Sequence, residues 1–189
     1  MTQGVNSSLI AHYPFGTMPW LIDVGGGNGA LLIAILQQST AMRGTVFELP
    51  HIVGHAREQV AAAGLSGRCD VIEGNAPVSV PSGAAGYLLK SVLHGRPDDQ
   101  AATVLRNCRS AMPSHGKVIV IERILPERID PANEWDRGNF IQDVGMMLTL
   151  GGKERTEVEF KSLFETAGLR LNQIVPTPGT TMIMEAVPV

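Results

Sequence analysis

Apolar and polar positions along the chain follow two patterns, one typical of buried strands and one typical of amphipathic helices. Short apolar runs bounded by glycine or charged residues predict strands at 20–24, 44–50, 69–74, 86–93 and 117–125. Helical spacing between these runs predicts helices at 28–38, 54–65 and 98–112. This regular alternation indicates an α/β fold in which a mostly parallel sheet is covered on both faces.

The last third of the chain changes this pattern. A polar stretch precedes a helix expected around 139–150, and a second helix is expected from Thr156, where Glu159 completes a capping box. Two final strands, 169–177 and 181–189, are close enough in sequence to pair as an antiparallel hairpin. We therefore expect a seven-stranded sheet with an antiparallel last strand, which is the arrangement of the Rossmann-like class I S-adenosylmethionine-dependent methyltransferases.

Composition narrows the function classes. The 189 residues are 44% hydrophobic with a formal net charge of -3, and their Lys and Arg residues are scattered, so no nucleic-acid partner is expected. The longest apolar runs are far short of the ~20 residues that span a bilayer, which predicts no membrane partner and a cytoplasmic location. Cys69 and Cys108 lack CxxC spacing and are expected to be buried, reduced thiols.

A glycine-rich loop, "DVGGGNGA", lies between the first strand and the first helix, where backbone amides approach a nucleotide-type ligand closely. Gly25, Gly27 and Ala30 also fit the dinucleotide fingerprint, so the loop alone does not separate NAD from S-adenosylmethionine. Two acids favour S-adenosylmethionine: Asp23 can face its ammonium or ribose, and Glu48 ends the second strand, placed to hold the ribose hydroxyls. The alternative for each is a solvated carboxylate at a strand end.

From about Tyr13 to the C-terminus, the chain resembles the plant and bacterial small-molecule O-methyltransferases of the caffeic acid and hydroxyindole type. The resemblance is carried by six stretches: "DVGGGNG", "FELP", "YLLKSVLH", "VLRNCRSAM", "VIVIERILP" and "GGKERTEVEF". It implies an S-adenosylmethionine cofactor bound by Gly25, Glu48 and Lys90, and a catalytic base at His94. Glutamates on either side of that base would be Glu122 and Glu154.

The chemistry of such an enzyme suits these residues. A phenol, with a pKa near ~10, is a poor nucleophile until a base takes its proton, and a histidine with a pKa of ~6.5 can do so at neutral pH. Carboxylates beside the ring would orient it and stabilise the imidazolium. No metal is expected. Glu122 and Glu154 have a second interpretation, as ion-pair partners of Arg123 and Arg155.

The chain also departs from the family pattern. Where the family has Gly-Asp and then an aromatic residue or Met after the third strand, this chain has Asn75 and Ala76, which predicts weaker cofactor binding. After His94 the usual Asp-Trp is replaced by Gly95 and Arg96.

Family members carry a helical front domain that makes their homodimer, and the resemblance implies that this chain corresponds to the catalytic half alone. We expect residues 1–18 to be a weakly ordered linker remnant and residues 19–189 to form the cofactor-binding domain.

The main hypothesis is an O-methyltransferase acting on a hydroxyl of a small, aromatic molecule. The rivals are a catalytically impaired or partner-dependent remnant and, less favoured, an NAD-dependent oxidoreductase.

Overall fold

The computed structural model describes residues 2–189 and contains one sheet of seven strands: β1 (Trp20–Val24), β2 (Arg43–Glu48), β3 (Cys69–Glu73), β4 (Gly86–Lys90), β5 (Lys117–Glu122), β8 (Leu169–Pro176) and β9 (Met182–Pro188). Their order across the sheet is β3-β2-β1-β4-β5-β9-β8. Strands β1 to β5 pair in parallel, and β9 runs antiparallel to both of its neighbours. The predicted sheet and its reversed last strand are confirmed.

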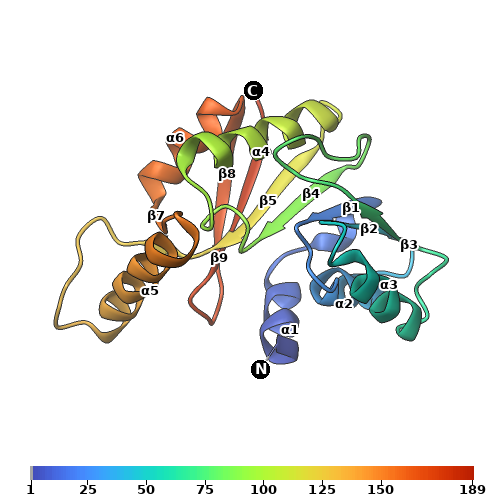
Figure 1. Cartoon of the computed structure of the whole chain (residues 1–189), viewed down its shortest axis with the longest axis horizontal. Coiled ribbons are helices and arrows are strands. Elements are labelled where there is room, and N and C mark those ends of the chain that lie inside the picture. Colours follow the sequence, from blue (N-terminus) through green and yellow to red (C-terminus); the bar gives the residue numbers. More distant parts are fainter. Residues whose placement is uncertain (1) are drawn as a thin grey trace.

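Helices cover both faces of the sheet (Figure 1). One face carries α4 (Asp98–Ala111) and α6 (Glu157–Thr166), and the other carries α1 (Thr2–His12), α2 (Ala30–Gln38) and α3 (Val53–Ala62). Neighbouring strand residues serve opposite layers: Leu88 packs with the α1–α3 layer and Leu89 with the α4–α6 layer. Because both faces are buried, the central strands are continuous apolar runs.

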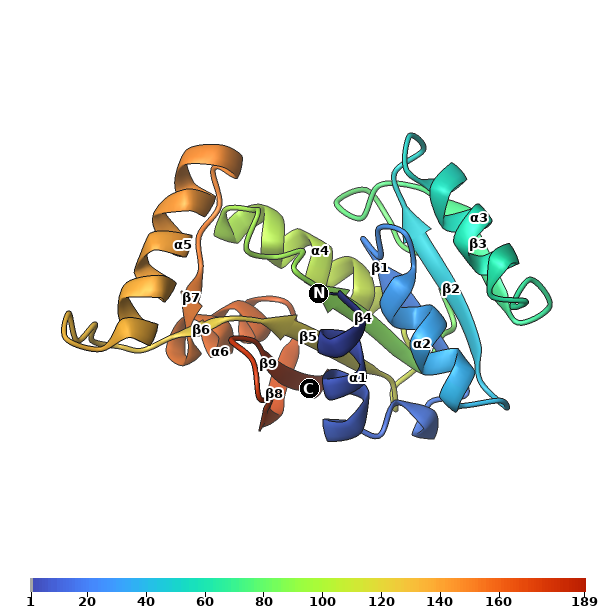
Figure 2. The ribbon, with the colours of Figure 1, turned by 90° about the horizontal axis from the view of Figure 1, so that it is seen from below.

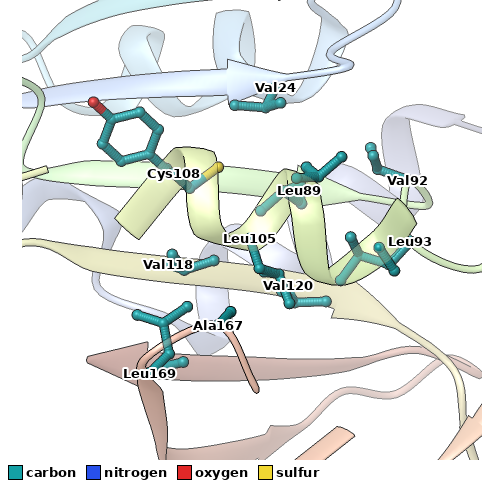
Figure 3. Close-up of a cluster of buried hydrophobic side chains, with 14 of the residues drawn as sticks. Val24, Leu89, Val92, Leu93, Leu105, Cys108, Val118, Val120, Ala167 and Leu169 are labelled. Atoms are coloured by element: carbon teal, nitrogen blue, oxygen red, sulfur yellow. The ribbon is translucent and has the colours of Figure 1, made fainter. Parts of the chain in front are cut away.

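The core on the α4 side shows why the amphipathic pattern predicted α4 correctly. Leu105 and Cys108 of that helix lie over Leu89, Val118 and Val120 of the sheet, and all five residues are fully buried (Figure 3). Cys69 and Cys108 are both free, buried thiols, as expected. Truncating a leucine in such a layer costs about 2 to 5 kcal/mol, so this packing holds the strand ends in place.

One helix, α5 (Glu134–Leu150), lies to the side of the layers (Figure 2). It begins earlier than the sequence pattern indicates, because the Asn133 side chain accepts a hydrogen bond from the Trp135 amide and caps the helix there. After α5, β7 (Arg155–Thr156) pairs with β6 (Ile124–Leu125) in a small second sheet that the sequence analysis missed. The capping box of Thr156 and Glu159 at the start of α6 is present, as predicted.

The front of the chain differs from the weakly ordered linker expected there. Residues 2–12 form α1, and Leu9, Tyr13, Phe15 and Met18 are buried in the α1–α3 layer. The Tyr13 hydroxyl donates a hydrogen bond to the buried carboxylate of Glu185 on β9, which Lys117 and Asn172 also contact at 2.9 and 2.6 Å. Apolar burial and this charged anchor together order the segment. Among residues 2–189 no helix has the length and apolar character needed to cross a bilayer.

The Tyr13 anchor gives a stability prediction. Burial raises the pKa of Glu185, but hydrogen bonds from Tyr13, Lys117 and Asn172 outweigh it and hold this pKa below its ordinary value. We expect Tyr13→Phe to lower the free energy of unfolding by about 1.5 to 3 kcal/mol at neutral pH, since a hydrogen bond to a charged group is lost. A depressed carboxyl pKa stabilises the fold above the unfolded-state pKa, and that stabilisation is lost as the pH falls, so the difference should shrink in acid.

The matched control is Tyr87→Phe, because the buried Tyr87 hydroxyl donates to the neutral Pro81 carbonyl at 2.7 Å. Its cost should be only about 0.5 to 1.5 kcal/mol and should not change with pH. Urea unfolding of both variants between pH 2 and 7 makes the comparison, because the stabilisation is lost only below the ordinary glutamate pKa. Equal, pH-independent costs would refute the charged anchor.

Candidate active site

The candidate site lies at the carboxyl ends of the parallel strands. The chain passes from β1 outward through β2 and β3, then returns to add β4 and β5 on the other side of β1. Ligands of open α/β sheets bind at such a switch point, here between β1 and β4. The glycine loop after β1 and Lys90 at the end of β4 line a cleft of about 210 Å³ at this place.

The glycine loop has the backbone that the sequence analysis required. Gly25 and Gly27 have φ of 69° and 58°, in the left-handed region that side chains disfavour. A Cβ on Gly25 would lie 2.9 Å from Val92 Cγ2, while a Cβ on Gly27 would meet nothing within 4 Å. Gly25 is thus needed for both conformation and close packing, and Gly27 for conformation alone.

Two charged side chains face the same cleft. Asp23 is 2% exposed, and Lys90 lies on the neighbouring strand. Burial raises the pKa of Asp23 to about 7, a shift that the Lys90 charge opposes and the Glu48 charge reinforces. A cation placed in the cleft would favour the ionised form of Asp23.

Glu48 ends β2 beside the loop. Its carboxylate accepts hydrogen bonds from the Gly27 amide at 2.9 Å and the Leu49 amide at 2.7 Å. These two donors fix the carboxylate at the edge of the glycine loop. Glu48 therefore lies where the sequence analysis placed a ribose-binding acid.

The structure does not bring Asn75 and Ala76 into this cleft. Asn75 is exposed just after β3, and Ala76 packs against the α4 layer, where its carbonyl accepts a hydrogen bond from Asn107 at 2.7 Å. Asn6 of α1, which the sequence analysis missed, does line the cleft and is 5% exposed. No local signal marks Asn6, because only tertiary packing carries α1 over the loop.

His94, Glu122 and Glu154 come together just beyond β4. His94 Nδ1 lies 3.1 Å from Glu154 Oε1 and 3.6 Å from Glu122 Oε2. Both glutamates are buried, whereas the His94 side chain is 19% exposed. The hydrogen bond to Glu154 raises the pKa of His94; burial opposes the shift, and the Glu122 charge adds to it. When the imidazole is neutral, a hydrogen bond from Nδ1 to Glu154 Oε1 leaves Nε2 as the acceptor.

Glu122 also organises the turn that carries His94. Its Oε1 accepts from the amides of Val92, Leu93 and His94 at 2.9, 2.7 and 3.3 Å. These amides converge because Ser91 adopts a φ of 57°, the one left-handed non-glycine residue among residues 2–189. Such a conformation costs about 1 to 2 kcal/mol, and it cannot be predicted from the sequence.

The alternative reading of the two glutamates is not what the geometry shows. Arg155 is paired with Asp98 at 2.9 Å, and Arg123 donates to the Asn139 side chain at 2.9 Å. The Arg96 guanidinium donates to the Val92 carbonyl at 2.7 Å. Both glutamates are therefore left to face His94.

The sheet order with its reversed last strand, together with a glycine loop at the switch point, defines the Rossmann-like fold of S-adenosylmethionine-dependent methyltransferases. Comparison with known proteins specifies the family: an O-methyltransferase domain model matches residues 2–170. The chain belongs to this O-methyltransferase family.

Relatives and solved structures agree with this family. The phenazine O-methyltransferase of Lysobacter antibioticus is 38% identical over 100% of this chain and 54% of its own length, and O-demethylpuromycin-O-methyltransferase of Streptomyces alboniger is 35% identical over 94% and 47%. The crystal structure of LaPhzM matches with a TM-score of 0.92 and 37% identity, over 100% of this chain and 55% of its own.

A second solved structure, the neocarzinostatin O-methyltransferase NcsB1, was determined with S-adenosylmethionine and a hydroxynaphthoic acid. It matches with a TM-score of 0.87 and 33% identity, over 97% of this chain and 53% of its own. The chain thus spans about half the length of the relatives that it matches.

The geometry predicts how His94 titrates. Glu154→Gln removes the charged partner of Nδ1, so the pKa of His94 should fall from its raised value toward the ordinary 6.5. NMR titration of the labelled imidazole measures the shift. Glu157→Gln is the control, because it removes the same charge from an exposed pair with Lys161. The His94 midpoint should not move in that variant; equal shifts in both would contradict the contact.

Proposed function

We propose that the chain is the catalytic half of an S-adenosylmethionine-dependent O-methyltransferase that methylates a hydroxyl of a small aromatic molecule, with His94 as the general base. The observation that carries the proposal is the pairing of His94 Nδ1 with the buried Glu154, which leaves Nε2 free to accept a proton. Relatives named for phenazine, puromycin and mitomycin methylation support an aromatic acceptor. A cytoplasmic location and a homodimeric whole protein belong to the same proposal.

The residues of the cleft fit the proposed cofactor. Asp23 is a buried carboxylate suited to the ammonium, Glu48 is held beside the loop for the ribose hydroxyls, and Lys90 lies across the cleft. Gly25 and Gly27 let the backbone approach the ligand closely. When bound, S-adenosylmethionine supplies a methyl group already activated by its sulfonium.

The protein residues then have two tasks. His94 Nε2 takes the proton of the acceptor hydroxyl as the oxygen forms its bond to the methyl carbon, and the sulfur keeps the electrons of the broken bond. Glu154 and Glu122 stabilise the imidazolium that results. Holding the donor and acceptor in line can contribute about 7 to 11 kcal/mol, so positioning is the larger task.

A partner-dependent enzyme is the second candidate, favoured by the exposed apolar side chains of α5. Trp135, Ile141 and Leu148 of this helix are 63%, 70% and 76% exposed, beside the segment that provides Glu154. Under this hypothesis the chain binds the cofactor without a partner, but it methylates the acceptor only together with a further domain.

His94→Ala should lower methyl transfer to a phenolic acceptor about 100-fold to 10,000-fold, because the hydroxyl loses its base. The wild-type rate should rise with pH and level off only above the raised pKa of His94, since the base must be neutral. His115→Ala, which removes an exposed histidine, is the control. A His94→Ala variant with the wild-type rate would reject the assignment.

Calorimetry with S-adenosylhomocysteine tests the cofactor site independently of turnover. Because the pKa of Asp23 is raised to about 7, binding of the ligand's ammonium should ionise this carboxyl and release a proton near neutral pH. The apparent enthalpy should therefore depend on the ionisation enthalpy of the buffer, and Asp23→Asn should abolish that dependence. Binding without turnover would favour the partner-dependent reading, and no binding would reject the cofactor assignment.

A further inference from the structure

Arg155 is a fully buried guanidinium that has no part in the mechanism above. It is 0% exposed and lies on β7, where it pairs with Ile124, two residues after Glu122. Its Nε donates to Asp98 Oδ1 at 2.9 Å. Its two other nitrogens donate to the carbonyls of Leu93 and Arg96 at 3.0 and 2.8 Å. Leu93 and Arg96 are the residues on either side of His94 and Gly95.

The segment before Arg155 packs directly against the same turn. A Cβ on Gly152 would lie 2.0 Å from the His94 carbonyl oxygen and 2.6 Å from the Arg96 nitrogen. Any side chain at position 152 would clash with the backbone of the His94 turn, so only glycine fits there. Glu154 and Arg155 follow two and three residues later, so this contact fixes how far they lie from His94 and from the carbonyls of Leu93 and Arg96.

We propose that Arg155 is a positioning residue that sets the distance between His94 and Glu154 by holding the two carbonyls that flank the base. The proposal rests on His94 acting as the base, and it adds a residue that touches no substrate. A planar guanidinium presents its donors in a fixed fork, so it can bind both carbonyls and Asp98 at once. The turn needs such a hold because Ser91 begins it in a left-handed conformation.

Lysine cannot replace this fork. Lys carries the same charge on a single flexible ammonium, so Arg155→Lys keeps the electrostatics of the site and loses the geometry. A misplacement of about 1 Å in a catalytic group can cost on the order of 100-fold in rate. We expect Arg155→Lys to lower kcat about 10-fold or more, with little change in KM for S-adenosylmethionine.

The chain provides a matched control in Arg68. Its guanidinium likewise holds backbone carbonyls, those of Leu36, Ser39 and Met42, at 2.9, 3.2 and 2.9 Å, but at the far side of the fold. Arg68→Lys should lower the Tm as Arg155→Lys does and leave kcat unchanged. A purely structural role for Arg155 would make the two variants behave alike.

A second readout works without turnover, and so separates this inference from the proposed function. The charged groups that face His94 are Glu154, Glu122 and Arg123, and none of them changes in Arg155→Lys. If the turn shifts, the hydrogen bond from Nδ1 to Glu154 weakens, and the His94 midpoint in an NMR titration should fall. Arg68→Lys should leave it in place.

Asp98→Asn provides a milder variant should Arg155→Lys not fold. It weakens the anchor of the guanidinium while Arg155 keeps its two carbonyls, so the same changes are expected at smaller size. An unshifted His94 midpoint in a folded Arg155→Lys or Asp98→Asn variant would overturn the positioning role. An inactive wild-type chain with a shifted midpoint in these variants would instead count against the proposed function alone.

Discussion

The turn after β4 depends on one buried carboxylate. Glu122 is 1% exposed and accepts from three consecutive amides, those of Val92, Leu93 and His94. Burial raises the pKa of Glu122, and the nearby His94 and the amides of Leu93 and His94 counter that shift. Removing one partner of a buried charge costs about 3 to 5 kcal/mol, so the carboxylate and the turn stabilise each other. This mutual stabilisation offsets the strain at Ser91.

The carbonyl groups of the same turn are held by a cation, the guanidinium of Arg155. The amides of the turn point to Glu122, and its carbonyls at Leu93 and Arg96 point to Arg155. Two buried side chains of opposite charge thus satisfy the donors and the acceptors of one short backbone segment. A peptide turn with both sets of groups satisfied has little freedom to move, which is what a base needs when positioning is the main source of catalysis.

Local signals in the sequence were enough for much of the fold, whereas Glu122 and Glu154 were expected beside His94 only from the family resemblance. Strand periodicity located all seven strands, and the capping box located the start of α6. The features that were missed depend on contacts far apart in the chain. Tyr13 and Glu185 are hydrogen-bonded although 172 residues separate them in sequence. Arg155 is bonded to Asp98, 57 residues away, and not to the adjacent Glu154. Glu154 lies just before β7 and Arg155 begins it, and the two adjacent side chains have different partners, His94 and Asp98.

The "GGKERT" stretch shows how α5 is coupled to the base. Gly151 ends α5 in a left-handed conformation, Gly152 packs against the His94 turn, and the Glu154 amide donates to Asp143 of α5 at 2.8 Å. Because α5 buries none of its own residues, this short connection and the link from Arg123 to Asn139 locate it. Whatever displaces α5 therefore also displaces Glu154, and with it the partner that orients His94. The position of α5 is thus tied to the geometry of the active site through Asp143 and Gly152.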